Sequence, residues 1–189
     1  MQRASYIEKQ VRLLAPYLTH TQTLLDFGCG DLTLARGIHE KFPKIHVTGI
    51  DVVDGGGRTS GIDFRLYDGK QVPFKDRFFD TSVAYHVFHH TEDPRMALYD
   101  LMRVTKRTIL MVEPVYRNRV DLFFMKILDR YGNGWRGVHI PMPFTFQHES
   151  TWRRFAREFG WSVLEAKPAG VLPGWLPFGE TKLFVLQRK

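Results

Sequence analysis

The sequence predicts one α/β domain with a doubly wound, mostly parallel sheet, and three observations carry this prediction. Short apolar runs alternate along the chain with segments whose apolar residues recur at helical spacing. The first run passes into two glycines separated by one residue, a turn typical of ligand-binding folds of this class. A length of 189 residues suits a single domain, residues 1–189, with a substantial core.

An N-terminal helix within residues 1–20, covering about Tyr6 to Tyr17, is the first expected element. The segment Ser5–Glu8 has the spacing of a capping box, which marks a helix start. Apolar residues then follow at helical intervals, at Ile7, Val11, Leu14 and Leu18. We expect this helix to pack on the sheet edge or over the ligand-binding end of the sheet.

The segment Thr23–Ala35 has the pattern of a strand, a tight turn and the start of a helix. An apolar run with Asp26 near its end leads into Gly28 and Gly30. Glycines let the backbone approach a ligand closely, and the helix start offers N–H groups to a polar ligand. A dinucleotide-binding turn would place its third glycine where Thr33 stands, so a nicotinamide-dependent oxidoreductase is the weaker interpretation.

Two further strands place acidic residues at the same edge as this turn. Residues 44–51 form a strand that ends in Asp51, close to the offset of about 20 residues at which such folds hold ribose hydroxyls with a carboxylate. A strand over residues 62–67 is followed by Asp68 and Gly69. Between the two strands, the glycine-rich run 54–61 is a poor helix, so we expect a short, irregular and mobile crossover.

A fourth strand is expected at residues 80–85, and it leads into a loop rich in histidine. His86, His89 and His90 together suggest a zinc cluster. A closed zinc site needs four ligands, and no second cluster of cysteine or histidine supplies the rest. We therefore predict no bound metal.

The fifth strand, residues 107–113, is apolar on both faces, as a central parallel strand should be. Its last residue, Glu113, either faces the reaction cavity or forms a salt bridge near the surface. Residues 115–148 form an expected insertion, in which residues 121–128 are apolar nearly all round and predict a buried or partner-covered helix. A last helix capped by Ser150 and a final pair of strands complete the chain.

Several of these motifs resemble the class I S-adenosylmethionine-dependent methyltransferases, and within them the type 11 methyltransferase domain. The string Asp26-Phe27-Gly28-Cys29-Gly30 is similar to the first motif of that family, with Leu32 where a third glycine usually falls. Residues 72–80 and 86–94 resemble two further family motifs. The resemblance covers residues 24–112 motif by motif. It implies a Rossmann-like sheet of seven strands in the order 3-2-1-4-5-7-6, with strand 7 antiparallel.

The resemblance also implies the cofactor, S-adenosyl-L-methionine, and the residues that hold it. In the family, the acid corresponding to Asp26 helps hold the methionine part of the cofactor. The resemblance assigns the ribose hydroxyls to Asp51 and the adenine amino group to Asp68. The turn and the strand ends complete the expected cofactor site, at Gly28, Cys29, Gly30, Val52, Gly69, Tyr85 and His86.

Methyl transfer is an in-line displacement, so it depends mainly on the alignment of the acceptor with the methyl group. If a general base is needed, the candidates by placement are His86, Glu113 and His139. The family commonly roofs its acceptor pocket with an insertion such as residues 115–148, whose aromatic content favours a flat or apolar small molecule. A non-catalytic cofactor-binding or RNA-associated module is the alternative, suggested by Leu32, the short crossover and the basic charge.

Composition limits the partners and the compartment. The formal net charge of +7 suggests RNA binding, but a solvated basic face explains it as well. No apolar stretch approaches the roughly 20 residues that span a bilayer, and the N-terminus is charged where a signal peptide is apolar. We therefore expect a cytoplasmic protein. The single cysteine, Cys29, excludes an internal disulfide and suits the turn as a small residue.

Overall fold

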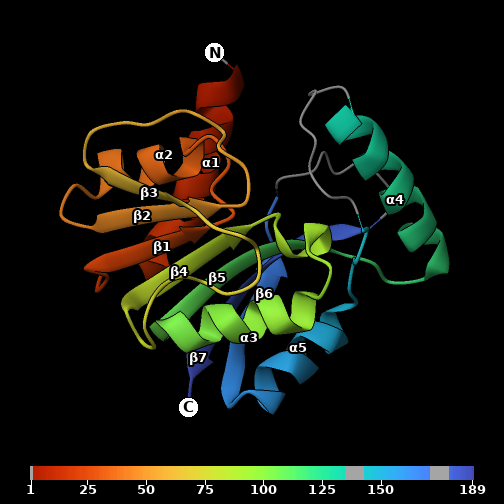
Figure 1. Ribbon diagram of the computed structural model, residues 1–189. Helices are drawn as coiled ribbons and strands as arrows, with labels where there is room; N and C mark the ends of the chain where they lie inside the picture. The colour runs from red at the N-terminus through yellow and green to blue at the C-terminus, as the bar shows by residue number, and fades with distance from the viewer. Residues whose placement is uncertain (1, 135–142, 171–178) are drawn as a thin grey trace.

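The computed structural model describes residues 2–134, 143–170 and 179–189 (Figure 1). Its strands are β1 (Thr23–Phe27), β2 (His46–Asp51), β3 (Ile62–Leu66), β4 (Phe79–Tyr85), β5 (Thr105–Val115), β6 (Trp161–Pro168) and β7 (Glu180–Arg188). Its α-helices are α1 (Gln2–Leu14), α2 (Thr33–Lys41), α3 (Pro94–Val104), α4 (Arg119–Gly134) and α5 (Glu149–Glu158). Two short 3₁₀ helices are η1 (Ala15–Tyr17) and η2 (Phe88–His90).

The strands form one sheet in the order β3-β2-β1-β4-β5-β7-β6. Neighbouring strands from β3 to β5 pair in parallel. Strand β7 runs antiparallel to both of its neighbours, β5 and β6. The predicted fold class, strand order and antiparallel strand are therefore confirmed.

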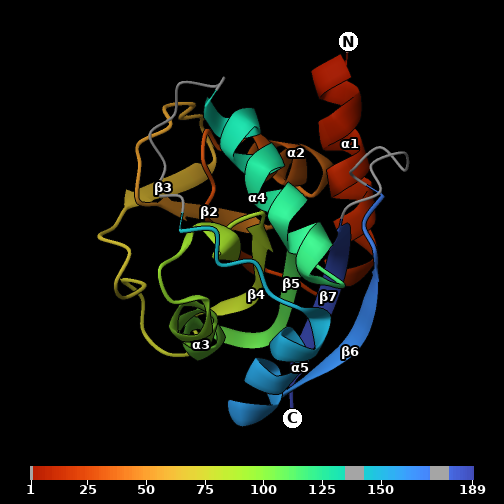
Figure 2. The same cartoon turned by 90° about the vertical axis from the view of Figure 1, so that its right-hand side faces the viewer.

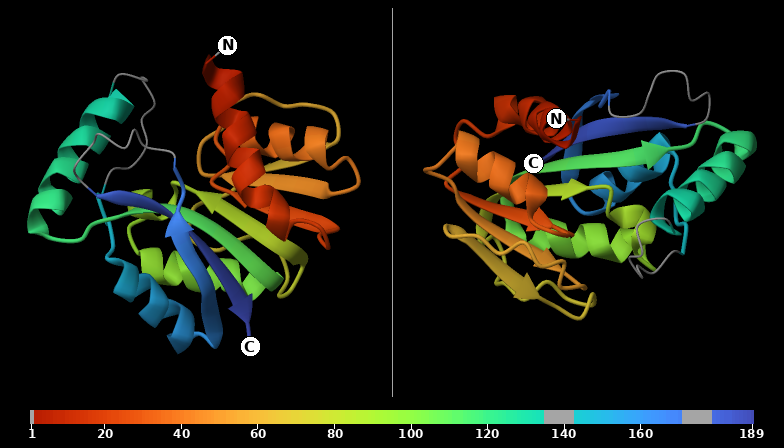
Figure 3. Two further views of the ribbon diagram at one scale, coloured as in Figure 1. Left: turned by 180° about the vertical axis from the view of Figure 1, so that it is seen from behind. Right: turned by 90° about the horizontal axis from the view of Figure 1, so that it is seen from above.

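Helices cover both faces of this sheet (Figure 3). One core contains Leu24 and Leu110 together with residues of α1 and α2. The other contains Leu25 and Ile109 together with residues of α3 and α5. Because successive side chains of a strand point to opposite faces, adjacent residues supply the two cores. This burial on both faces explains why the strands are continuous apolar runs in the sequence.

Several element boundaries differ from the sequence predictions by a few residues. The N-terminal helix does not start at the Ser5–Glu8 capping box: α1 begins at Gln2 and ends at Leu14, and Pro16 lies in η1. Proline has no N–H to continue the α-helical ladder, which accounts for the change to a 3₁₀ turn. Helix α5 is capped by His148 rather than Ser150, because Nδ1 of His148 accepts the Ser150 backbone N–H at 3.2 Å.

Helix α4 stands outside both helical layers, at one end of the sheet (Figures 1 and 2). It is buried on one side only. Met125 is 6% exposed, whereas Val120, Phe123 and Tyr131 are 58%, 61% and 69% exposed. In the part of the chain that the structure describes, no helix has the length and apolar composition needed to cross a membrane.

Asp80 ties β4 to the start of β1 and to β5. One carboxylate oxygen accepts the backbone N–H groups of Gln22 and Thr23, each at 3.0 Å, and the other accepts Nζ of Lys106 at 3.0 Å. Burial acts to raise the pKa of Asp80, but Lys106 and the two N–H groups outweigh it and lower the pKa to about 2.

The substitution Asp80→Asn should reduce the free energy of unfolding by about 1–2 kcal/mol near neutral pH, because hydrogen bonds to the charge are weakened. The folded pKa of about 2 lies below the ordinary value of 3.8. The stabilisation is therefore complete above the ordinary value and is lost as the pH falls through the folded value. Urea unfolding of both proteins across an acidic pH series measures the effect. A difference in unfolding free energy that does not shrink in acid would contradict this account of Asp80.

Candidate active site

The parallel register brings the expected cofactor residues to one edge of the sheet. Phe27, the last residue of β1, pairs with Ile50 of β2 and Ala84 of β4, and Asp51 pairs with Leu66 of β3. The ends of these four strands are therefore level. At or just beyond these ends lie Asp26, Gly28, Cys29, Gly30, Asp51, Val52, Asp68, Gly69, Tyr85 and His86.

The turn after β1 uses two left-handed glycines and a left-handed leucine. The φ angles are 71° at Gly28, 54° at Gly30 and 61° at Leu32. A left-handed backbone costs a leucine about 1–2 kcal/mol. The Leu32 side chain is fully buried, and a Cβ added to Gly49 of β2 would lie 2.5 Å from its Cδ2. Thus Leu32 adopts the left-handed backbone conformation that glycine usually provides at this position of the turn. Its side chain fills the space that the missing side chain of Gly49 leaves open.

Asp51 joins this turn to the end of β2. Its Oδ2 accepts the backbone N–H of Gly30 at 2.7 Å, and its Oδ1 accepts the N–H of Val53 at 3.1 Å. A Cβ added to Gly30 would meet no atom within 4 Å, so the space beside Gly30 is open. A carboxylate oxygen has more than one acceptor site, which leaves Asp51 able to accept ligand hydroxyls in that space.

Asp26 is 1% exposed, and its Oδ2 has no hydrogen-bond partner among the described residues. Burial and the neighbouring charge of Asp51 raise the pKa of Asp26 to about 7, against a lowering effect of the Ala35 backbone N–H. Burial, Asp26 and Asp51 also raise the pKa of the Cys29 thiol. The thiolate is the reactive form of cysteine, so Cys29 is unsuited to act as a nucleophile.

Asp68 lies on the exposed loop after β3. The backbone N–H of Lys70 donates to its Oδ1 at 3.0 Å and lowers the pKa of Asp68. A Cβ added to Gly69 would lie 3.1 Å from the Val52 side chain, so the loops after β2 and β3 are in contact. An open hollow of about 590 Å³ adjoins Asp68 but includes no residue of the glycine turn. It is lined by residues 65–68 and 71–75.

The crossover between β2 and β3 has no helix or strand, which confirms its expected irregularity. It lies against the glycine turn. A Cβ added to Gly55 would lie 2.5 Å from the Gly30 carbonyl oxygen, and one added to Gly57 would lie 2.2 Å from that of Asp31. Glycine is therefore needed where the two backbones meet. The mobility expected of this crossover stays a prediction.

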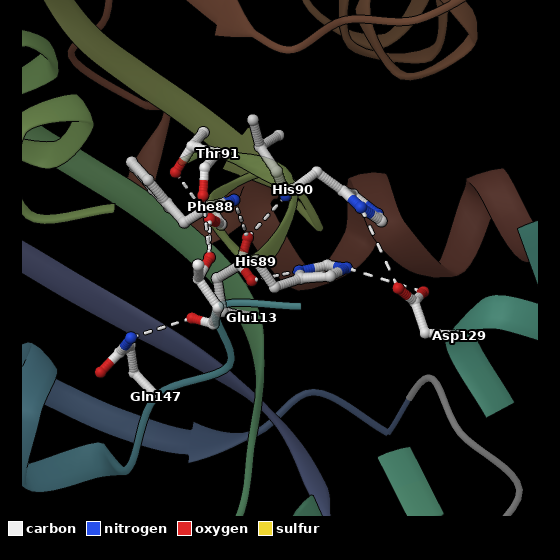
Figure 4. A network of polar contacts seen from close by, with 9 residues as sticks. Phe88, His89, His90, Thr91, Glu113, Asp129 and Gln147 are labelled. Atoms are coloured by element: carbon white, nitrogen blue, oxygen red, sulfur yellow. Dashed lines mark hydrogen bonds and ion pairs between the residues drawn. The ribbon is translucent and has the colours of Figure 1, made fainter. Parts of the chain in front are cut away.

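Glu113 is completely buried and holds the loop that follows β4 (Figure 4). Its Oε1 accepts the backbone N–H groups of Val87 at 2.6 Å and Phe88 at 2.8 Å, and its Oε2 accepts Nδ1–H of His89 at 2.7 Å. Burial acts to raise the pKa of Glu113, but His89 and the Phe88 N–H lower it overall. The structure thus places Glu113 beneath the loop, where it positions backbone. Its role as a general base stays a prediction.

The loop held by Glu113 covers part of the glycine turn. A Cβ added to Gly28 would lie 2.6 Å from a methyl group of Val87. His86 has a left-handed φ of 58°, and its ring stacks on Tyr85 with centroids 5.0 Å apart. The Gly28 side of the turn is therefore closed by Val87, while the Gly30 side is open.

The third candidate base, His139, lies outside the described residues, and its role also stays a prediction. Sequence reasoning missed the positioning contacts of Glu113 and a group of side chains formed by His89, His90 and Asp129. The spacing of the inward residues Met125 and Asp129 on α4 was the available signal, because residues four apart share a helix face.

Comparisons with known proteins agree with this architecture. Residues 25–111 match the family described as a methyltransferase domain. An uncharacterized methyltransferase of Schizosaccharomyces pombe is 30% identical over 106 residues, which cover 48% of this chain and 38% of that protein. A demethylmenaquinone methyltransferase of Paenarthrobacter aurescens is 30% identical over 115 residues, covering 51% of this chain and 46% of that protein. The chain spans less than half the length of these relatives.

A solved structure extends the likeness to nearly the whole chain. The magnesium protoporphyrin IX methyltransferase of Synechocystis, crystallised with bound SAH, superposes with a TM-score of 0.69 at 15% identity. The match covers 98% of this chain and 84% of that one. Residues 25–111, just under half of the chain, therefore match the methyltransferase domain family, and the fold of the sheet is that of a solved methyltransferase. The cofactor of this family is S-adenosyl-L-methionine.

The substitution Asp26→Asn should stabilise the cofactor-free protein at alkaline pH and have little effect in mild acid. The folded pKa of about 7 lies above the ordinary value of 3.8, so stability falls as the pH rises between these values. Asn keeps the shape of the side chain and removes the buried charge. We expect a gain of about 3–6 °C in melting temperature above pH ~8, measured by circular dichroism.

The same melting curves recorded near pH ~4 are the control, because Asp26 is then neutral in the folded protein and only about half ionised in the unfolded chain, so most of the pH-dependent loss of stability has yet to occur. An equal change in melting temperature at both pH values would show that the charge of Asp26 is not responsible.

Proposed function

We propose that this protein transfers the methyl group of S-adenosyl-L-methionine to a small-molecule acceptor. One observation carries the proposal: Asp26 and Asp51 lie at or next to the ends of β1 and β2 and Asp68 lies just after β3, so three adjacent parallel strands bring carboxyl groups to one edge beside a glycine turn. The family match over residues 25–111 supports the same reaction. The fold alone would not support a particular reaction, because one fold hosts many activities.

The residues at this edge suit the parts of the cofactor. The buried Asp26, with an oxygen that lacks a partner in the described chain, suits the ammonium group of the methionine part. Asp51 lies beside the open space at Gly30 and suits the ribose hydroxyls. Asp68 is exposed at the next strand end, next to a hollow, and suits the adenine amino group. When bound, the cofactor supplies a methyl group already activated by its sulfonium charge.

The chain's own task is then alignment and exclusion of water, which can contribute about 7–11 kcal/mol to catalysis. The loop after β4 is suited to this task because Glu113 fixes its backbone at Val87 and Phe88. Tyr85 and His86 precede this fixed segment and form one stacked pair at the strand end. This rigidity favours a role for His86 in lining the site, as the sequence predicts.

For the acceptor, we propose a flat or largely apolar small molecule, with the insertion 115–148 as the roof of its pocket. Helix α4 carries exposed apolar side chains, including Phe123 and Tyr131. One relative is named a demethylmenaquinone methyltransferase, which supports an acceptor of this class.

Cofactor binding can be tested with Asp51→Ala and Asp68→Ala. Each should weaken binding of S-adenosyl-L-methionine by about ten-fold or more, because each removes a charged hydrogen-bond acceptor. Isothermal titration calorimetry gives the affinities. The matched control is Asp63→Ala, which removes an exposed carboxylate of β3 that pairs with His46 at 3.0 Å. Unchanged affinity in both test variants would contradict the assignment.

Turnover is a separate experiment. Formation of S-adenosylhomocysteine should be followed with a panel of quinols, phenols and carboxylic acids. Transfer to at least one member supports the proposal. Cofactor binding with no turnover on the panel, together with salt-sensitive retention of RNA, would favour a binding module instead.

A further inference from the structure

Three side chains of metal-ligand type meet beside Glu113, and they come from two distant parts of the chain (Figure 4). His89 and His90 lie in η2, and Asp129 lies on α4. Nε2 of His89 is 3.9 Å from one carboxylate oxygen of Asp129, and Nδ1 of His90 is 4.0 Å from the other. The potential ligand atoms all lie within 4.8 Å of one another. The group is largely buried, with His89 only 4% exposed.

His89 is oriented by its other ring nitrogen. A carboxylate only accepts hydrogen bonds, so the contact between Nδ1 and Glu113 Oε2 at 2.7 Å places a proton on Nδ1. Nε2 then faces Asp129. The ring is also held by stacking on Phe146, with centroids 4.9 Å apart and planes 12° apart. A buried carboxylate that orients a histidine in this way is the arrangement found behind metal-binding histidines.

His90 supplies an independent observation. Its Nδ1 atom is buried, and among the described residues no group makes a hydrogen bond to it. A buried polar atom without a hydrogen bond costs free energy, and native structures rarely leave one. In Figure 4 the ring of His90 points to the same carboxylate as that of His89. A cation between the three side chains would give this nitrogen a partner.

We propose that His89, His90 and Asp129 bind a zinc ion. Two imidazole nitrogens and one carboxylate oxygen are a donor set used for Zn²⁺ in sites that keep a fourth position open. At bond lengths of about 2.0–2.1 Å, tetrahedral ligand atoms lie about 3.4 Å apart. On zinc binding, the distances of 3.9 and 4.0 Å would shorten by about 0.5 Å, and the widest separation in the group, which is no more than 4.8 Å, by up to about 1.4 Å.

This proposal revises the prediction that no metal is bound. That prediction depended on the lack of a second ligand cluster along the sequence, and here the third ligand comes from the insertion. The ion would link η2, which Glu113 fixes at the cofactor edge, to α4 at the end of the sheet.

The test uses the full, tag-free chain after removal of metals with a chelator. Calorimetric titration with zinc chloride should show one ion per chain, and X-ray absorption of the zinc-loaded protein should show imidazole and carboxylate ligands. Asp129→Asn and His90→Gln should each weaken zinc binding by about ten-fold or more. Zinc should raise the melting temperature of the wild type and not of Asp129→Asn, because only the wild type gains binding free energy.

The matched control is Asp63→Asn at the exposed His46–Asp63 pair, which should bind zinc as the wild type does. No stoichiometric binding to the wild type would overturn the proposal. So would unchanged affinity in the Asp129 and His90 variants, or an equal loss in the control. If a variant does not fold, the wild-type protein alone still tests the proposal, through the zinc stoichiometry from calorimetry and the ligands from X-ray absorption. No methyl donor is present in these titrations, so their result is independent of the methyl-transfer proposal.

Discussion

The buried carboxylate of Glu113 binds the loop that follows β4 through hydrogen bonds. The arrangement of this end of the molecule depends on that interaction. Glu113 lies near the end of β5 and has no exposed surface, and burial of such a charge is tolerable only when its oxygens are fully engaged. Its donors are two backbone N–H groups of the loop after β4 and one histidine ring. The loop therefore has one defined position. That position sets Val87 against Gly28 and turns His89 toward α4.

Negative charge is the second constraint at the same edge. Asp26 is buried near the end of β1, just before the turn. Asp51 is close enough to help raise the pKa of Asp26. Folding thus places an acid where its ionisation is unfavourable, and a cationic group beside it would relieve that cost. A sulfonium cofactor with an ammonium group has this charge. The electrostatics of the cofactor-free edge and the proposed ligand are in this way complementary.

Helix α4 belongs both to the proposed acceptor pocket and to the proposed zinc site. Its exposed face carries aromatic side chains, and its buried side carries Asp129 opposite the two histidines of η2. Among the described residues of α4, Met125 is buried, whereas Val120, Phe123 and Leu128 are exposed. A metal link between Asp129 and η2 would fix the position of the proposed acceptor roof relative to the cofactor edge.

The strand order was implied by the resemblance to a known family, whereas the sequence by itself determined the α/β class and the positions of the acids and glycines at the strand ends. These are local properties, since hydrophobic period and turn chemistry involve residues close together in the chain. Tertiary structure alone decided that Leu32 could replace a glycine, because Gly49 of the next strand leaves it room. It also decided the partners of Glu113 and the meeting of Asp129 with His89 and His90. Those contacts depend on how separate elements pack, and no pattern within a short window of sequence records them.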